Sequence, residues 1–177
     1  MTYRFGTCLA VAAGLLVSAP LHAQEREGAI SATDLSDREE IRTLLLEYGR
    51  AFDDRRLEDY ANLFAEQGEW VGSSMQARGP ADILAMMRNS FGKSPPNSQR
   101  PNYHIMTNII VDTDGDKGTA WSRWTFYSVG DDGRPSIAAA GRYEDELIRE
   151  GGKWKFLRRR ALNDFNYTPS SSAKTGQ

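Results

Sequence analysis

The sequence predicts an α+β fold in which helices cover one face of a curved antiparallel sheet. Two observations support this fold class. Between residues 36 and 91, apolar residues recur at three- and four-residue spacing, which is typical of amphipathic helices. From residue 102 onward, β-branched and aromatic runs are separated by turns rich in Gly and Asp, which is typical of consecutive strands. Because the helices come first and the strands follow as one block, a meander is expected.

The first 23 residues have the pattern of a secretory signal peptide. Arg4 precedes an apolar run at residues 8–17, and small residues end at Ala23 before a charged segment. We therefore expect cleavage after Ala23 and a secreted or periplasmic mature protein. The apolar run is too short for a membrane span, so no membrane partner is expected. Residues 24–35 are interpreted as a linker.

The helical part is expected to contain three helices and one short strand. Ser36 and Glu39 form a Ser-x-x-Glu capping box, which predicts that the first helix begins there. A second short helix follows at residues 57–64, and residues 69–72 form a short strand. Gly79-Pro80 places a proline at the start of the third helix. The apolar faces of these helices comprise Ile41, Leu44, Leu45, Tyr48 and Phe52, then Leu57, Tyr60, Leu63 and Phe64, then Ile83, Leu84, Met87 and Phe91.

Four strands are expected in the second half, and the domain is bounded at residues 36–166. The strands are predicted near 103–111, 118–129, 136–149 and 153–165. Aromatic residues occupy both odd and even positions of residues 121–127, so both sheet faces are expected to be covered. The helices can cover only one face, which predicts a homodimer or homotrimer. Residues 167–177 have little to bury and are predicted to be disordered.

Composition excludes several function classes. The chain has 22 Lys and Arg against 24 Asp and Glu, a balance that gives no reason to expect nucleic acid. Its only cysteine, Cys8, and one of its two histidines, His22, lie in the leader. Without the leader, the chain has no cysteine, and His104 is its one histidine. The lack of cysteine excludes thiol chemistry, and with one histidine most metal sites are excluded too. No metal or cofactor is therefore expected.

His104 is the candidate for proton transfer near neutral pH, because unperturbed imidazole has a pKa of about 6.5. Asp53, at the predicted end of the first helix, is the candidate that orients its ring. A carboxylate bonded to one ring nitrogen fixes the tautomer and stabilises the imidazolium that forms on proton uptake. The alternatives stay open at this point: His104 as a hydrogen-bonded structural residue, and Asp53 as the start of a turn.

Nineteen residues, in their order and spacing, resemble the SnoaL-like branch of the nuclear transport factor 2-like superfamily. They are Tyr48, Phe52, Asp53, Tyr60, Ala61, Leu63, Phe64, Gly79, Pro80, His104, Thr107, Asn108, Gly141, Arg142, Tyr143, Asp145, Arg149, Gly152 and Trp154. The resemblance implies a cone-shaped barrel, in which the curved sheet wraps the N-terminal helices around an internal apolar pocket. It does not settle function, because this fold hosts enzymes, binding modules and scaffolds.

Within the superfamily, the chain is most similar to the scytalone dehydratase and hexachlorocyclohexane dehydrochlorinase types. These pair a helix-end aspartate with a histidine from the first meander strand, and Asp53 and His104 stand at those positions. Two departures matter. The second histidine of scytalone dehydratase has no counterpart after maturation, and Arg56 stands where a second acid is frequent.

Further site residues are expected around this pair. Tyr48 lies about 140° around the helix from Asp53 and is a candidate acid that flanks the pocket from the other side. Asn108 shares strand parity with His104 and Met106, so it is expected to face the same interior. The expected substrate contacts are Asn108, Met106, Tyr143 and Phe52. The three arginines at 158–160 alternate faces, and a solvated or subunit-facing role is their default interpretation.

The leading hypothesis is an exported, cofactor-independent lyase or isomerase that acts on a small hydrophobic molecule. The competing hypothesis is a non-enzymatic periplasmic binding protein that holds such a molecule in the same pocket. A third possibility is a purely structural dimerisation module, which predicts a filled interior.

Overall fold

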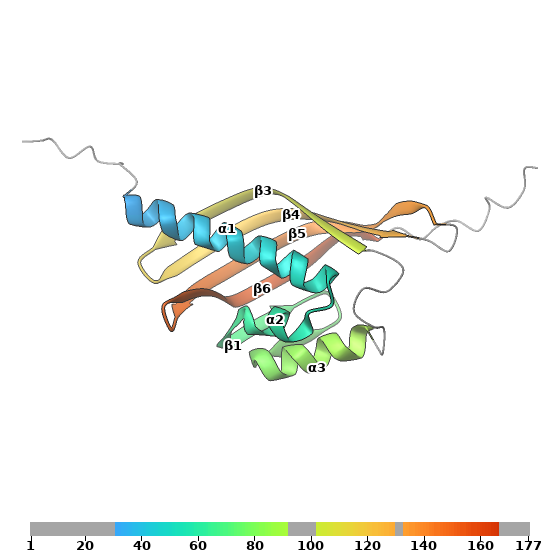
Figure 1. Cartoon of the computed structure of the whole chain (residues 1–177), viewed down its shortest axis with the longest axis horizontal. Coiled ribbons are helices and arrows are strands. Elements are labelled where there is room, and N and C mark those ends of the chain that lie inside the picture. The colour runs from blue at the N-terminus through green and yellow to red at the C-terminus, as the bar shows by residue number, and fades with distance from the viewer. Residues whose placement is uncertain (1–30, 92–101, 130–132, 167–177) are drawn as a thin grey trace, which may run out of the picture.

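The computed structural model describes residues 31–91, 102–129 and 133–166, and it has the predicted α+β fold. The elements, in order, are α1 Ala32–Asp53, α2 Leu57–Asn62, β1 Phe64–Val71, β2 Gln76–Arg78, α3 Gly79–Phe91, β3 Asn102–Asp114, β4 Lys117–Val129, β5 Pro135–Glu150 and β6 Lys153–Asn166. The six strands form one curved sheet in the order β2-β1-β6-β5-β4-β3. Helix α1 crosses one face of this sheet, and α2 and α3 lie near β1 (Figure 1).

Helix α1 begins earlier than predicted. Ser31 is its N-cap: the Ser31 hydroxyl accepts a hydrogen bond from the Asp34 backbone, and the Asp34 carboxylate accepts one from the Ser31 backbone. This Ser-x-x-Asp box satisfies two free N–H groups at the helix start. The predicted box at Ser36 therefore lies inside the helix, and the predicted linker is too long at its C-terminal end. The predicted signal peptide, the predicted tail and the rest of the linker lie outside the described residues.

The meander strands match the prediction to within three residues at each end, but β1 and β2 differ from it. Strand β1 begins at Phe64, where the second helix was expected to continue, and β2 was not expected. Strand β1 pairs in parallel with β6, with Phe64 opposite Phe156. Both side chains are fully buried and their ring centroids lie 5.1 Å apart. This burial favours an extended chain at Phe64 over another helical turn.

The hydrophobic core lies between α1 and the sheet. Its fully buried members include Ile41 and Leu45 of α1, Tyr60 of α2 and Ile83 of α3. These residues belong to the apolar faces expected from the sequence, so the helical periodicity identified the core correctly. None of the described helices has the length and apolar character needed to cross a membrane.

Asp37 joins the N-terminal end of α1 to the end of the sheet. Its carboxylate accepts hydrogen bonds from Arg149 of β5 and, at 3.4 Å, from the indole of Trp154 of β6. The Arg149 guanidinium also lies over the Trp154 ring, 4.8 Å from its centroid. Because Asp37 is buried, these bonds are shielded from solvent.

Replacing Asp37 with Ala is expected to lower the free energy of unfolding by about 1–3 kcal/mol, because Arg149 and Trp154 lose a buried acceptor. Urea unfolding monitored by circular dichroism measures the change. Asp112→Ala is the control: Asp112 pairs with Arg38, but its side chain is 69% exposed, and a loss below about 1 kcal/mol is expected. Equal losses in the two variants would contradict the role given to Asp37.

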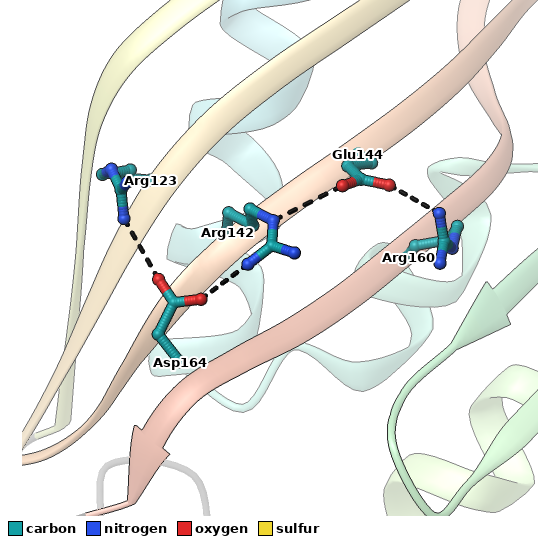
Figure 2. A network of polar contacts seen from close by, with 5 residues as sticks. All are labelled: Arg123, Arg142, Glu144, Arg160 and Asp164. Atoms are coloured by element: carbon teal, nitrogen blue, oxygen red, sulfur yellow. Dashed lines mark hydrogen bonds and ion pairs between the residues drawn. The ribbon is translucent and has the colours of Figure 1, made fainter.

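The sheet face turned away from α1 carries a row of paired charges (Figure 2). Asp164 binds Arg123 at 3.1 Å and Arg142 at 2.6 Å. Glu144 continues the row, with Arg142 at 3.4 Å and Arg160 at 2.6 Å. Beside this row, β3 presents three exposed apolar side chains, Tyr103, Ile105 and Ile110. A face whose charges are already paired can be covered by a second protein surface without leaving an ion unpaired.

The homodimer or homotrimer stays a prediction, and this outer face is where we propose that a second copy packs. Light scattering of the mature protein at micromolar concentration is expected to give the mass of a dimer or trimer. Ile105→Glu adds an unpaired charge to the face and is expected to shift the mass to that of a monomer. Leu46→Glu, at an exposed position of α1, serves as the control. A monomeric mass for the unaltered protein would rule the proposal out.

Candidate functional site

The end of α1 and the start of β3 are joined by two hydrogen bonds between Asp53 and His104. The Asp53 carboxylate accepts a bond from the His104 backbone N–H at 2.7 Å, and its other oxygen lies 2.6 Å from the ring nitrogen Nδ1. The two side chains are 17% and 7% exposed, so solvent competes little for these bonds. The carboxylate thus sets both the position of the strand and the orientation of the ring. Nε2 is left on the side away from Asp53.

Local backbone geometry brings Asp53 to this place. Helix α1 ends at Asp53, and two residues later Arg55 adopts a left-handed φ of 58°. This conformation reverses the chain into α2. Arg56 does not add a second functional group to the pair, because its guanidinium binds Glu47 at 2.6 Å and Asp59 at 2.7 Å.

Two phenylalanine rings contact the His104 imidazole. The ring centroids of Phe52 and Phe126 lie 4.6 Å and 4.8 Å from that of His104. Phe126 is the cross-strand partner of His104 in the β3–β4 register. With Nδ1 bonded to Asp53 and two phenylalanine rings in contact, the imidazole has little freedom to rotate.

The His104 ring lines a cavity of about 290 Å³ between α1 and the sheet. Six of its fourteen lining residues are Phe, Tyr or Trp, namely Tyr48, Phe52, Trp70, Trp124, Phe126 and Tyr143. The remaining lining residues are Gly72, Ser73, Ser74, Met75, Ala139, Ala161 and Asn163. A cavity of this size and composition accommodates a small, flat, largely apolar molecule.

The Tyr48 hydroxyl is the centre of a second polar group in the cavity wall. It accepts hydrogen bonds from the Tyr60 hydroxyl at 2.7 Å and from the Trp70 indole at 3.0 Å. Tyr48 also contacts Tyr143, with ring centroids 5.5 Å apart in an edge-on arrangement. The predicted acid therefore lies in the cavity wall and is held in place from two sides.

A buried ion pair lies behind these tyrosines. Arg159 of β6 and Asp145 of β5 are both fully buried and form two hydrogen bonds of 2.7 Å. The guanidinium carbon of Arg159 lies 3.9 Å from the Tyr48 ring centroid and 4.1 Å from that of Tyr143. Burial opposes the charge on Arg159, but the Asp145 carboxylate raises the pKa of Arg159 above its ordinary value. A fixed cation thus stands behind two residues of the cavity wall.

The pKa values of two tyrosines are raised by this environment. Burial raises the pKa of Tyr60 well above its ordinary value, and the neighbouring Tyr48 adds to the shift while Arg159 opposes it. Burial likewise raises the pKa of Tyr143 well above its ordinary value. Both phenols consequently remain protonated, as hydrogen-bond donors, across the neutral and mildly alkaline range.

The structure brings most of the predicted site residues together. Asp53 contacts His104, and Tyr48, Phe52 and Tyr143 line the same cavity as His104. Met106 is half-buried and packs against the core, but it is not a lining residue of this cavity.

The expectation that Asn108 faces the same interior as His104 was wrong, because Asn108 is exposed. The register of β3 against β4 shifts between Thr107 and Ile110, and Asn108 adopts a left-handed φ of 53°. This bulge breaks the alternation of faces on which the parity argument depended.

Sequence reasoning missed other members of the site. Trp124 and Phe126 share a strand face, and a register that placed Phe126 opposite His104 would have identified both. Trp70 was assigned only to a short strand. The default interpretation of the three arginines at 158–160 was a solvated or subunit-facing role, and it was wrong for Arg159. Arg158 and Arg160 are exposed, whereas Arg159, which points to the other sheet face, is fully buried. Within the described part of the chain, no group of three or more His, Cys, Asp or Glu residues could hold a metal ion.

Comparison of the structure with solved ones shows the fold. An NTF2-like protein with a cystatin-like fold from Novosphingobium aromaticivorans matches with a TM-score of 0.63 and 24% identity, covering 73% of this chain and 83% of that one. ActVI-ORFA from Streptomyces coelicolor matches with a TM-score of 0.63 and 21% identity, covering 73% and 98%. The helices and the curved sheet thus have an NTF2-like, cystatin-like fold.

Sequence comparison then identifies the family. The model of the SnoaL-like domain matches residues 33–160, and the chain belongs to this family. A similar chain is the uncharacterised protein Rv2910c from Mycobacterium tuberculosis H37Rv, which is 29% identical over 140 residues, covering 73% of this chain and 87% of the relative. The fold and family expected from the sequence are therefore confirmed, and the roles of the site residues remain predictions.

The melting temperature is expected to fall as the pH rises above about 10, where tyrosines of the unfolded chain ionise. The raised pKa of Tyr60 in the folded state contributes stability below that pH, which is lost as the pH rises further. Tyr60→Phe should therefore show a shallower alkaline decline in thermal melts between pH 8 and 11. Tyr103→Phe, at an exposed position, should follow the wild type. An unchanged slope in Tyr60→Phe would contradict this linkage.

Proposed function

We propose that this protein is an exported, cofactor-independent lyase or isomerase that acts on a small hydrophobic molecule. His104 is the base, Asp53 orients it, and Tyr48 is the acid. The observation that carries the proposal is the pair of hydrogen bonds that the Asp53 carboxylate accepts from the backbone and ring of His104, which lines a cavity. Export rests on the leader pattern of residues 1–23 alone.

The geometry supports proton abstraction by Nε2 of His104. Asp53 next to Nδ1 favours the tautomer that carries the proton on Nδ1, which leaves Nε2 free to accept a proton. When Nε2 takes up that proton, the adjacent carboxylate stabilises the imidazolium. General-base assistance of this kind contributes about 10²–10⁴-fold, which suffices for a C–H made acidic by a carbonyl or a leaving group.

The lining of the cavity supports a hydrophobic substrate of modest size. Six of the fourteen residues that line the cavity of about 290 Å³ are Phe, Tyr or Trp. The polar groups are confined to a few positions, among them His104, Tyr48 and Tyr143, which would orient a guest rather than solvate it. An open cavity also argues against the purely structural dimerisation module, which predicts a filled interior.

The alternative function is that of a non-enzymatic binding protein for a small hydrophobic ligand in the periplasm. In this case His104 and Asp53 only satisfy each other's hydrogen bonds. The two functions differ in what the histidine does. A binding protein should keep its ligand affinity within a few-fold in His104→Asn, whereas Asp53→Asn should mainly lower its stability.

Exchange of substrate hydrogens for solvent deuterium, followed by NMR, tests the base directly. A panel of small aromatic ketones, β-hydroxy ketones and alkyl halides covers isomerisation, dehydration and dehydrohalogenation. At least one compound should exchange or turn over with the wild type. His104→Ala should lower that rate by about 10²–10⁴-fold, because it removes the general base.

The controls separate chemistry from folding. Asp53→Asn keeps the shape of the side chain but removes its charge, so the rate should fall while circular dichroism shows a folded protein. Tyr103→Phe, on the outer face, should leave the rate unchanged. If no compound reacts with the wild type in a way that depends on His104, the enzymatic proposal is wrong.

A further inference from the structure

We infer that a second cavity, lined by residues of β1, β2, β6 and the start of α3, is a separate ligand site for a small anion with an apolar body, such as an aromatic carboxylate. Arg78 of β2 and Arg158 of β6 bind the anionic group. The inference does not depend on the proposed function, because none of the charged residues of this second cavity lines the first cavity, which is the one that contains His104.

The second cavity has a volume of about 390 Å³ and a lining of two kinds. Trp70, Val71 and Ala77 form the apolar part, and four of the other five lining residues are charged. An apolar wall with a few polar groups orients a small molecule by its polar end. The lining therefore suits a molecule with one ionised group and one apolar body.

Glu69 lies between two arginines in this lining. It is opposite Arg78 in the antiparallel β1–β2 pair and opposite Arg158 in the parallel β1–β6 pair. Side chains of residues directly opposite each other in neighbouring strands project from the same face of a sheet. The three side chains thus form a row in which two cations flank one carboxylate. One positive charge is in excess, and one bound anion balances it.

The two arginines are attracted to Glu69 but are not hydrogen-bonded to it. Arg78 Nη1 and Arg158 Nε each lie 3.7 Å from a Glu69 oxygen, beyond the length of about 3.2 Å that N–H···O bonds reach. In the charged row on the outer face, by contrast, Arg142 and Arg160 bind carboxylates at 2.6 Å (Figure 2). The N–H groups of Arg78 and Arg158 are therefore not engaged by Glu69 and can donate to an anion.

The other carboxylate of the lining, Asp82, does not replace that anion. Both Arg78 and Arg158 form their ion pairs with Glu69. Asp82 lies in the first turn of α3, where the positive end of the helix dipole stabilises a negative charge. The helix itself supports the charge of Asp82, so the excess positive charge of the arginine row remains for a ligand.

Trp70 belongs to the linings of both cavities. Its indole N–H donates a hydrogen bond of 3.0 Å to the Tyr48 hydroxyl. Its ring also lies close against Gly72, where an added Cβ would stand 2.5 Å from the ring carbon Cη2. The protein's own contacts thus fix the residue that the two cavities share, and the second site adjoins the first through a preformed wall.

Calorimetric titration of the mature protein with 2-naphthoate tests the second site without requiring turnover. This probe combines a carboxylate with a flat apolar body, and we expect a dissociation constant below about 1 mM at low salt. Added NaCl should weaken binding, because the side chains of Arg78 and Arg158 are 64% and 44% exposed and are screened by salt. 2-Naphthamide has a similar shape without the charge and should bind at least about 10-fold more weakly.

Variants locate the probe. Arg78→Gln and Arg158→Gln should each weaken binding by about 3- to 10-fold, because each removes charge-assisted donors. Glu69→Gln should strengthen binding several-fold, because it removes the carboxylate that competes for both arginines. Arg123→Gln is the matched control: it removes an arginine with a 53% exposed side chain from the outer face and should bind as the wild type does. His104→Ala, in the first cavity, should also bind as the wild type does.

Three results overturn the inference. They are the absence of saturable 2-naphthoate binding by the wild type, equal binding of 2-naphthamide, and an affinity that neither Arg78→Gln nor Arg158→Gln lowers more than Arg123→Gln does. The third result, combined with a loss of affinity in His104→Ala, would place the probe in the first cavity.

Discussion

The contact between Asp53 and His104 is the constraint on which the rest of the site depends. One carboxylate holds a backbone N–H and a ring nitrogen of the same residue, so the end of α1 and the start of β3 are fixed together. If the carboxylate bonded only the ring, the strand could shift relative to the helix without breaking the pair. The double contact couples the orientation of the imidazole to the packing of the helix on the sheet, and the cavity lies along this junction.

The fold could be predicted where local chemistry decides it. Proline at the start of α3 and turn residues between the meander strands act within a few residues, and the structure confirms those elements. The parallel pairing of β1 with β6 could not be predicted this way, because it joins Phe64 to Phe156 across most of the domain. The bulge at Asn108 could not be predicted for another reason. Asn tolerates a left-handed φ but does not require it, so its presence does not indicate a bulge.

Site residues of a type that is rare in this chain could be predicted from the sequence, whereas those of common core types could not. The chain has two histidines, and one of them, His22, lies in the predicted leader, so His104 and a carboxylate at a helix end were natural candidates. Tyrosines and tryptophans are also ordinary core residues, so Tyr60 and Trp70 carried no signal of their own. Their relation to Tyr48 depends on three rings from α1, α2 and β1 meeting at one oxygen, and only the tertiary structure establishes that meeting.

The buried ion pair of Arg159 and Asp145 lies between the core and the cavity wall. Removing two charges from water is costly, and well-packed apolar residues of similar volume often give equal or better stability. Stability alone is therefore a weak reason for an ion pair at a fully buried position of the sheet. The location of the pair is more informative. The Arg159 guanidinium lies over the rings of Tyr48 and Tyr143, and both tyrosines also line the cavity. The ion pair therefore places a fixed positive charge beside two residues of the cavity wall, which a neutral core of similar volume would not provide.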